Sequence, residues 1–161
     1  MSNKHLIEDY WQAYLASLPD TTPHPAGYCE AWSFGSTPEL AKQLGGLVKA
    51  GIKTATSSLA WSYEAENASL PQVGTISIIT DGAGWPLCII ETVETEVKAF
   101  SAVDERFAYD EGEGDRSLGC WQRVHWEVFS AECAVIGRKP AEDMPIVCER
   151  FRVLYTGGGN A

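Results

Sequence analysis

The sequence predicts an α+β protein whose sheet is curved or barrel-like. Apolar residues follow helical spacing over residues 4–18, over 38–50 and again after Asp115. Strand-like runs cover residues 73–80, 87–100 and 147–155, and turn-forming residues at 81–84 separate the first two. Such consecutive strands form a β-meander, and this order of helices and antiparallel strands is typical of the α+β class.

The first helix is predicted over residues 4–18, with Asn3 as its N-cap. Residues 19–27 contain three prolines and a glycine, which predict an extended surface loop. Because nothing here marks a second domain, we expect the helix to pack on the same core. Its apolar stripe consists of Leu6, Ile7, Tyr10, Tyr14 and Leu18.

The second helix has a clear start and a clear end. Thr37 supplies a hydroxyl N-cap, Pro38 occupies the first helical position, and Gly51 ends the helix. The interior pair Gly45-Gly46 indicates either a bend or a close approach of another element. The buried stripe consists of Leu40, Leu44, Leu47 and Val48.

The second half of the chain contains two further helices and a last strand. Ser101 and Asp104 match a capping signature, so a short helix is expected to begin at Ser101 and run through Phe107. Residues 110–117 hold four acids and two glycines and are predicted to form a loop, with Asp115 as N-cap of the next helix. That helix places Leu118, Trp121, His125, Val128 and Phe129 at helical spacing, and the last strand contains Val147, Phe151, Val153 and Tyr155.

Composition limits the classes of partner. The chain has 161 residues and a formal net charge of −10, which disfavours non-specific binding to nucleic acid or anionic membrane. It has no apolar run that could span a membrane and no signal-peptide pattern near Met1, so we expect a cytoplasmic protein. The five cysteines lack metal-binding spacing and are expected to be reduced and structural.

The stretch Gly51–Ser58 is the first candidate site. It contains Lys53 among four hydroxyl residues, and a desolvated lysine can act as the base of a neighbouring hydroxyl. The alternative is a helix cap followed by a solvated lysine and a hydroxyl-rich edge strand. The four hydroxyl residues are Thr54, Thr56, Ser57 and Ser58.

The acidic loop is the second candidate. Glu111 is a possible general acid/base, whereas acidic loops are more often simply solvated. Oxygen ligands also suit Mg²⁺ or Ca²⁺, but the Ca²⁺-loop spacing is not met, so no metal and no other cofactor is predicted. The four possible ligands are Asp110, Glu111, Glu113 and Asp115.

Aromatic residues form the third candidate. Their rings are suited to stacking on a nucleobase, and the alternative is ordinary core packing, which we favour for Trp121 and His125. The set consists of Trp61, Tyr63, Trp121, His125 and Trp126.

Three segments together resemble bacterial ASCH-domain proteins. They are Phe34–Leu40, Ala50–Thr56, and Glu111–Leu118 with the following Trp121 and His125-Trp126. The resemblance extends over Trp32 to Tyr155. It implies a PUA-like fold, a small open β-barrel flanked by helices, with a concave face suited to RNA or a nucleoside. On this basis the chain divides into an N-terminal helix and loop (1–30), an ASCH domain (31–156) and a disordered tail (157–161).

The resemblance also implies an activity. Some small bacterial members are amidohydrolases of N4-acetylcytidine, and a ribonuclease activity is attributed to others. In the amidohydrolases a Lys-Thr-x-Thr segment and a glutamate form a catalytic triad, which corresponds here to Lys53, Thr56 and Glu111. The broader family motif Gly-x-Lys-x-x-Glu-x-Arg is matched at its first two positions, whereas Thr56 and Ser58 replace its glutamate and arginine.

The leading hypothesis is therefore a hydrolase of an acylated cytosine nucleoside. Lys53 would activate the Thr56 hydroxyl, Glu111 would protonate the leaving amine, and backbone N–H groups near Ser57 would hold the oxyanion. The rival is a non-catalytic RNA-binding module, and a ribonuclease is the third candidate. A basic stripe would favour RNA as the ligand, and its members would be Lys42, Lys49, Lys53, Arg116 and Arg123. Neither a membrane nor DNA is expected as a partner, and the oligomeric state is left open. The substrate-binding residues expected are Thr54, Ser57, Ser58, Trp61, Tyr63, Arg116, Ser117 and Trp121.

Overall fold

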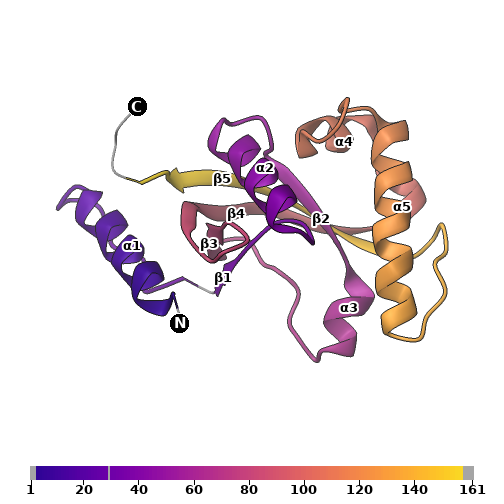
Figure 1. Cartoon of the computed structure of the whole chain (residues 1–161), viewed down its shortest axis with the longest axis horizontal. Helices are drawn as coiled ribbons and strands as arrows, with labels where there is room; N and C mark the ends of the chain where they lie inside the picture. Colours follow the sequence, from indigo (N-terminus) through magenta and orange to yellow (C-terminus); the bar gives the residue numbers. More distant parts are fainter. Residues whose placement is uncertain (1–2, 29, 158–161) are drawn as a thin grey trace. The chain divides into compact units, whose positions relative to one another are not determined.

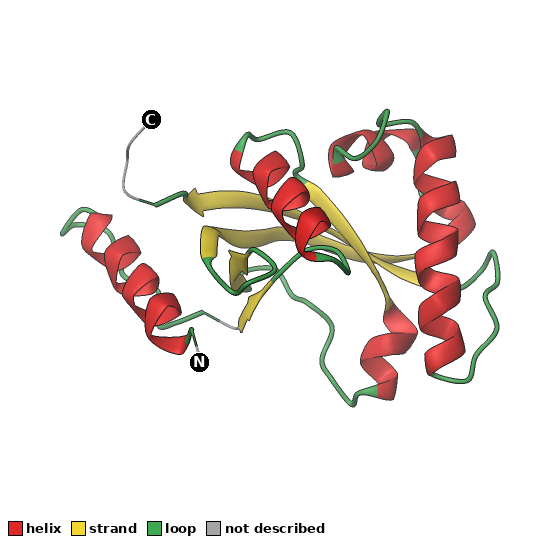
Figure 2. Ribbon diagram, in the orientation of Figure 1, coloured by secondary structure: helices red, strands yellow, loops and turns green. Residues whose placement is uncertain are grey.

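The computed structural model describes residues 3–28 and 30–157 (Figure 1). The helices, red in Figure 2, are α1 (Lys4–Ser17), α2 (Pro38–Lys49), α3 (Ala60–Ala65), α4 (Glu105–Glu111) and α5 (Leu118–Val135), with a 3-10 turn η1 at Phe100–Ala102. The strands are β1 (Glu30–Trp32), β2 (Ala55–Leu59), β3 (Ile76–Thr80), β4 (Pro86–Ala99) and β5 (Pro145–Tyr155).

The strands form one mixed sheet in the order β1-β3-β4-β5-β2. β3 and β4 pair antiparallel, as do β2 and β5, whereas β1 runs parallel to β3 with Ala31 opposite Ile78. β1 was not among the predicted strands, because a three-residue strand is too short to show an alternating pattern, and its parallel pairing adds to the antiparallel strands that were predicted. β2 is an edge strand, so only one of its sides is paired within the sheet.

The chain divides into two compact units. The first comprises residues 1–51, 74–91 and 152–161, and the second comprises residues 52–73 and 92–151. In the first unit, α1 buries an aromatic and aliphatic face against β3 and β4. That core contains Ile7, Trp11, Tyr14, Ile76, Ile78 and Ile89.

The ends of α1 and α2 follow the expected chemistry only in part. The Thr37 side chain accepts a hydrogen bond from the Leu40 amide, and Gly51 adopts a φ of +77° after the last turn of α2. Asn3, by contrast, does not cap α1 with its side chain, which instead donates to the carbonyl of Ala83.

Gly45 is the glycine of the interior pair that matters for packing. A Cβ placed there would lie 2.4 Å from Leu87 Cδ1, so the close approach predicted as one alternative is the correct one at this position. A Cβ at Gly46 would meet open space.

In the second unit, α5 lies beside α3 and α4 and packs on β2 (Figure 1). The inward residues of β2, Ala55 and Leu59, are fully buried, as period-two alternation requires. Among the buried residues of this core are Ala55, Leu59, Phe100, Phe107, Trp121, Phe129, Met144 and Ile146.

Two predicted helix starts in this unit are displaced. Asp104, rather than Ser101, caps α4, which continues through Asp110 and Glu111, so the acidic segment begins as helix and not as loop. Ser117, rather than Asp115, caps α5 by accepting from the Cys120 amide. The helix α3 was not predicted, because it follows β2 directly and no side-chain hydrogen bond caps it.

Within residues 3–28 and 30–157, no helix is long and apolar enough to cross a membrane. Cys88, Cys120, Cys133 and Cys148 are free thiols, in agreement with the prediction for these four. Cys29 and residues 158–161 of the predicted tail lie outside the described residues.

Candidate active site

The end of α4 is attached to the segment that leads into β2. The Thr54 amide donates to the carbonyl of Asp110 over 2.8 Å, and the Thr54 hydroxyl donates to the same oxygen. Gly112 follows α4 with a φ of +73°, and a Cβ there would lie 2.8 Å from the carbonyl oxygen of Ile52. A glycine is therefore required where the backbone carrying Glu111 crosses the backbone carrying Lys53.

Lys53 is buried, with 1% of its surface exposed. Its Nζ donates to the carbonyl of Ala55 at 2.9 Å and to the Glu113 carboxylate at 2.8 Å. It also lies 3.2 Å from Glu111 Oε1 and 3.3 Å from the carbonyl oxygen of Glu111. An ammonium has three protons to donate, so this set of oxygen acceptors suits the charged form of the side chain.

Glu111 is the carboxylate at the centre of the site, and it is also 1% exposed. Its Oε2 accepts hydrogen bonds from the Ser57 hydroxyl, at 2.8 Å, and from the Trp121 indole N–H. Burial alone would raise the pKa of Glu111, but Lys53, His125 and these two hydrogen bonds together lower it below its ordinary value. Glu111 is therefore ionised at neutral pH.

His125 and Trp121 form the wall behind this carboxylate on α5. Their rings stack with centroids 4.5 Å apart, and His125 Nδ1 lies 2.9 Å from the carbonyl oxygen of Trp121. A donor proton on Nδ1 satisfies that contact and leaves Nε2 facing Glu111 Oε2 at 3.6 Å. The remaining indole face packs toward Phe100.

Exposure separates the members of this cluster. Lys53, Glu111, Trp121 and His125 are all buried, whereas Ser57 and Glu113 are half-buried. Ser57 and Glu113 are therefore more accessible to solvent than Lys53 and Glu111.

The structure brings Lys53 and Glu111 together, but it does not bring Thr56 to them. Side chains alternate along a strand, so Ser57 shares the face of Ala55 and Leu59, and Thr56 lies on the other face. Thr56 is opposite Glu149 in the β2–β5 ladder, whereas Ser57 is opposite Cys148. The hydroxyl beside Glu111 is that of Ser57.

The predicted aromatic and hydroxyl ligands are dispersed. Trp121 is 4% exposed with both ring faces covered, so it cannot stack on a base as it stands. The Tyr63 hydroxyl lies 3.1 Å from Ser58 Oγ, and Trp61 carries the Arg138 guanidinium on its ring. Trp61 and Tyr63 instead line a separate hollow of about 240 Å³ beside α3.

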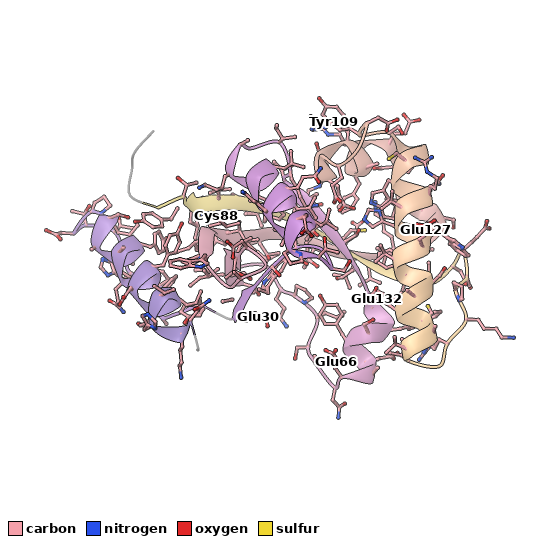
Figure 3. The ribbon with its side chains drawn as sticks, viewed as in Figure 1. Glu30, Glu66, Cys88, Tyr109, Glu127 and Glu132 are labelled. Atoms are coloured by element: carbon pink, nitrogen blue, oxygen red, sulfur yellow. The ribbon has the colours of Figure 1, made fainter. Side chains whose placement is uncertain are left out.

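Arg116 lies next to the site. Its Nε donates to the backbone carbonyl of Tyr109 over 2.9 Å, and its guanidinium carbon lies 3.6 Å from the centroid of the Tyr109 ring. Tyr109, labelled on α4 in Figure 3, is 52% exposed. The neighbouring Ser117, predicted as a substrate-binding residue, caps α5 with its side chain.

Glu111, Glu113 and His125 are the residues that could hold a metal ion. Each offers one ligand atom, and these atoms lie within 4.8 Å of one another. Lys53 Nζ contacts both carboxylates and supplies a positive charge between them. The other two acids predicted as ligands point elsewhere, since Asp110 pairs with Arg150 at 2.5 Å and Asp115 accepts from the Ser117 amide.

Comparisons with known proteins show the family of the chain. The family model described as the ASCH domain matches residues 30–155. The chain belongs to the ASCH-domain family. The ASCH domain from Lactobacillus crispatus JV V101 has 34% sequence identity and a TM-score of 0.88, covering 94% of this chain and 95% of that one. A protein from Enterococcus faecalis V583 has 33% identity and a TM-score of 0.83, covering 94% of this chain and 90% of that one. No curated protein matches the sequence.

The PUA-like fold expected from the resemblance is thereby confirmed for this ASCH domain, as a mixed five-stranded sheet with flanking helices. Three residues of the cluster were given lesser roles at the level of sequence: Ser57 as a substrate-binding residue, Glu113 as a possible metal ligand and His125 as a core residue. Ser57 lies four positions after Lys53, an even spacing that places two side chains on one face of an extended segment. His125 lies one helical turn after Trp121. Those spacings were available signals, but nothing in them shows that α4 and α5 converge on β2.

Proposed function

We propose that this ASCH domain is a hydrolase that acts on an acylated cytosine nucleoside, of the N4-acetylcytidine type. The observation that carries the proposal is the hydrogen bond from the Ser57 hydroxyl to Glu111, a buried carboxylate that pairs with Lys53. A hydroxyl that can act as nucleophile and a carboxylate that can act as general base and acid are groups suited to amide hydrolysis.

The geometry supports a role for each residue of the proposed site. Lys53 is surrounded by oxygen acceptors, so it is better placed to orient Glu111 than to accept a proton. Glu111 is the proton acceptor beside the hydroxyl, and it can return that proton to the exocyclic amine of the leaving cytosine. The Trp121 indole N–H holds the carboxylate from the side of α5, and His125 Nε2 lies 3.6 Å from the same oxygen.

An RNA-binding module is the second candidate, and Arg116 is the observation that favours it. Its guanidinium carbon lies 3.6 Å from the centroid of the ring of exposed Tyr109, and an arginine beside an exposed aromatic ring is suited to binding phosphate and stacking bases. The net charge of −10 opposes binding to long RNA and favours a small ligand.

Two assays run in parallel separate the two candidate functions. The purified protein is assayed for release of cytidine from a panel of N4-acylcytidines and, in parallel, for binding to single-stranded RNA by fluorescence anisotropy. The hydrolase proposal predicts turnover of at least one acylcytidine together with weak RNA binding. A protein that is inert toward the whole panel but binds RNA tightly is the RNA module instead.

A further inference from the structure

We infer that Ser57 is the nucleophile of this site and that Glu111 accepts its proton. The inference rests on the hydrolase function proposed above and specifies the residue that attacks the acyl group. It differs from the expectation drawn from the Lys-Thr-x-Thr segment, which assigns that role to Thr56.

The orientation of β2 is the first step. Ser57 Oγ lies 2.8 Å from Glu111 Oε2, within normal hydrogen-bond distance for a hydroxyl that donates to a carboxylate. Strand alternation places Thr56 on the opposite face, where its cross-strand neighbour is Glu149. The carboxyl of Glu149 accepts a hydrogen bond from Thr92. Thr56 could contact Glu111 only if the pairing of β2 shifted by one residue, because such a shift moves every side chain of a strand to the opposite face.

Exposure is the second step. Lys53 and Glu111 are each 1% exposed, whereas Ser57 and Glu113 are half-buried and are the more accessible members of the cluster. Of these two, Ser57 carries the hydroxyl. The buried carboxylate can therefore act on a substrate through the proton that it shares with Ser57 Oγ.

The chemistry balances with the substrate and water as the only reactants. As Ser57 Oγ attacks the acyl carbon, its proton passes to Glu111 Oε2 and the new Oγ–C bond forms. The C–N4 bond then breaks, and Glu111 returns the proton to the departing amine, which leaves cytidine and an acyl-serine. Water attacks the acyl carbon and gives one proton to Glu111, and Glu111 returns that proton to Oγ as the carboxylic acid leaves.

The test compares Ser57→Ala with Thr56→Ala, using Ser62→Ala on α3 as a matched control outside the cluster. Circular dichroism checks that each variant is folded. We expect Ser57→Ala to slow hydrolysis of N4-acetylcytidine by at least about 100-fold, and Thr56→Ala and Ser62→Ala to slow it by less than about tenfold. Loss of turnover in folded Thr56→Ala with turnover retained in Ser57→Ala would overturn the inference.

A second readout does not depend on the nucleoside. A fluorophosphonate probe forms a stable phosphonyl ester with an activated serine and releases fluoride, and peptide mass spectrometry locates the adduct. We expect the adduct on Ser57 in the wild type and its absence in Ser57→Ala. An adduct on Thr56, or no adduct on β2, contradicts the assignment. If Ser57 is labelled but no acylcytidine is hydrolysed, the nucleophile stands and the proposed substrate is wrong.

Discussion

Lys53 is a cation shared by two carboxylates, and its burial makes it important for stability as well as for the site. It pairs with Glu111 at 3.2 Å and with Glu113 at 2.8 Å. Removing one partner of a buried ion pair leaves the other charge without compensation, which is far more costly than losing an exposed pair. The same residue therefore links the folding of α4 to the orientation of the carboxylate.

Lys53→Met is expected to lower the free energy of unfolding by roughly 3–5 kcal/mol, because it leaves Glu111 as an uncompensated buried charge. Urea unfolding followed by tryptophan fluorescence measures the change. Lys98→Met is the matched control. The Lys98–Glu96 pair has the same 2.8 Å distance as the Lys53–Glu113 pair, but both of its side chains are partly exposed. The control is expected to cost no more than about 1 kcal/mol. Equal losses in the two variants would show that Lys53 is not part of a tight buried pair.

At the scale of elements, the site depends on how α4 ends. The helix delivers Glu111 in its last turn, and Gly112 then turns the chain with a left-handed backbone conformation against the carbonyl oxygen of Ile52. Hydrogen bonds from Thr54 to Asp110 complete the attachment. Displacement of this junction moves Glu111 away from both Lys53 and Ser57.

Gly112→Ala is therefore expected to destabilise the protein by at least about 1–2 kcal/mol, the cost of a left-handed non-glycine residue, before the clash with Ile52 is added. Thermal unfolding provides the measurement. Gly119→Ala in α5 serves as the comparison, because a Cβ there meets open space and alanine favours a helix. A Gly112→Ala protein as stable as Gly119→Ala would contradict the described junction.

The elements also show what sequence reasoning can reach. The start of α2 was predictable because Thr37 and Pro38 are adjacent, and a local side-chain cap decides a helix end. The starts of α4 and α5 were misplaced because Ser101 and Asp115 are equally good caps locally, and packing decides among neighbours. Lys53 and Glu111 could be proposed as partners. Which hydroxyl contacts Glu111 depends on which face of β2 points toward α4, and Glu111 lies 54 residues after Ser57 in the chain. No local pattern carries that information.

At the scale of the whole molecule, charge governs how stability and binding respond to conditions. The formal net charge is −10, so any contact with nucleic acid must come from a local set of cations. We predict weak binding to single-stranded RNA that falls steeply as salt is raised, measured by anisotropy titrations at several salt concentrations. Tight binding that is insensitive to salt would instead favour the RNA-binding module.

The response to acid follows from Glu111. Its pKa is lowered on folding, although burial by itself opposes this, because Lys53 and His125 favour the ionised form. The stability that it contributes is therefore present above the ordinary glutamate value of 4.5 and is lost as the pH falls below it through the folded pKa. Wild type is expected to lose its advantage in stability over Glu111→Gln as the pH is lowered from 7 through this range. An advantage independent of pH would show that Glu111 does not contribute as a carboxylate.

The most direct single test of the proposed hydrolytic site is the steady-state rate of cytidine release from N4-acetylcytidine by wild type and by Glu111→Gln. Circular dichroism checks that both proteins are folded. If Glu111 is the proton acceptor, wild type turns over and the folded Glu111→Gln variant is slower by at least about 100-fold. Equal rates in the two proteins, or no release of cytidine by wild type, would contradict the proposed site.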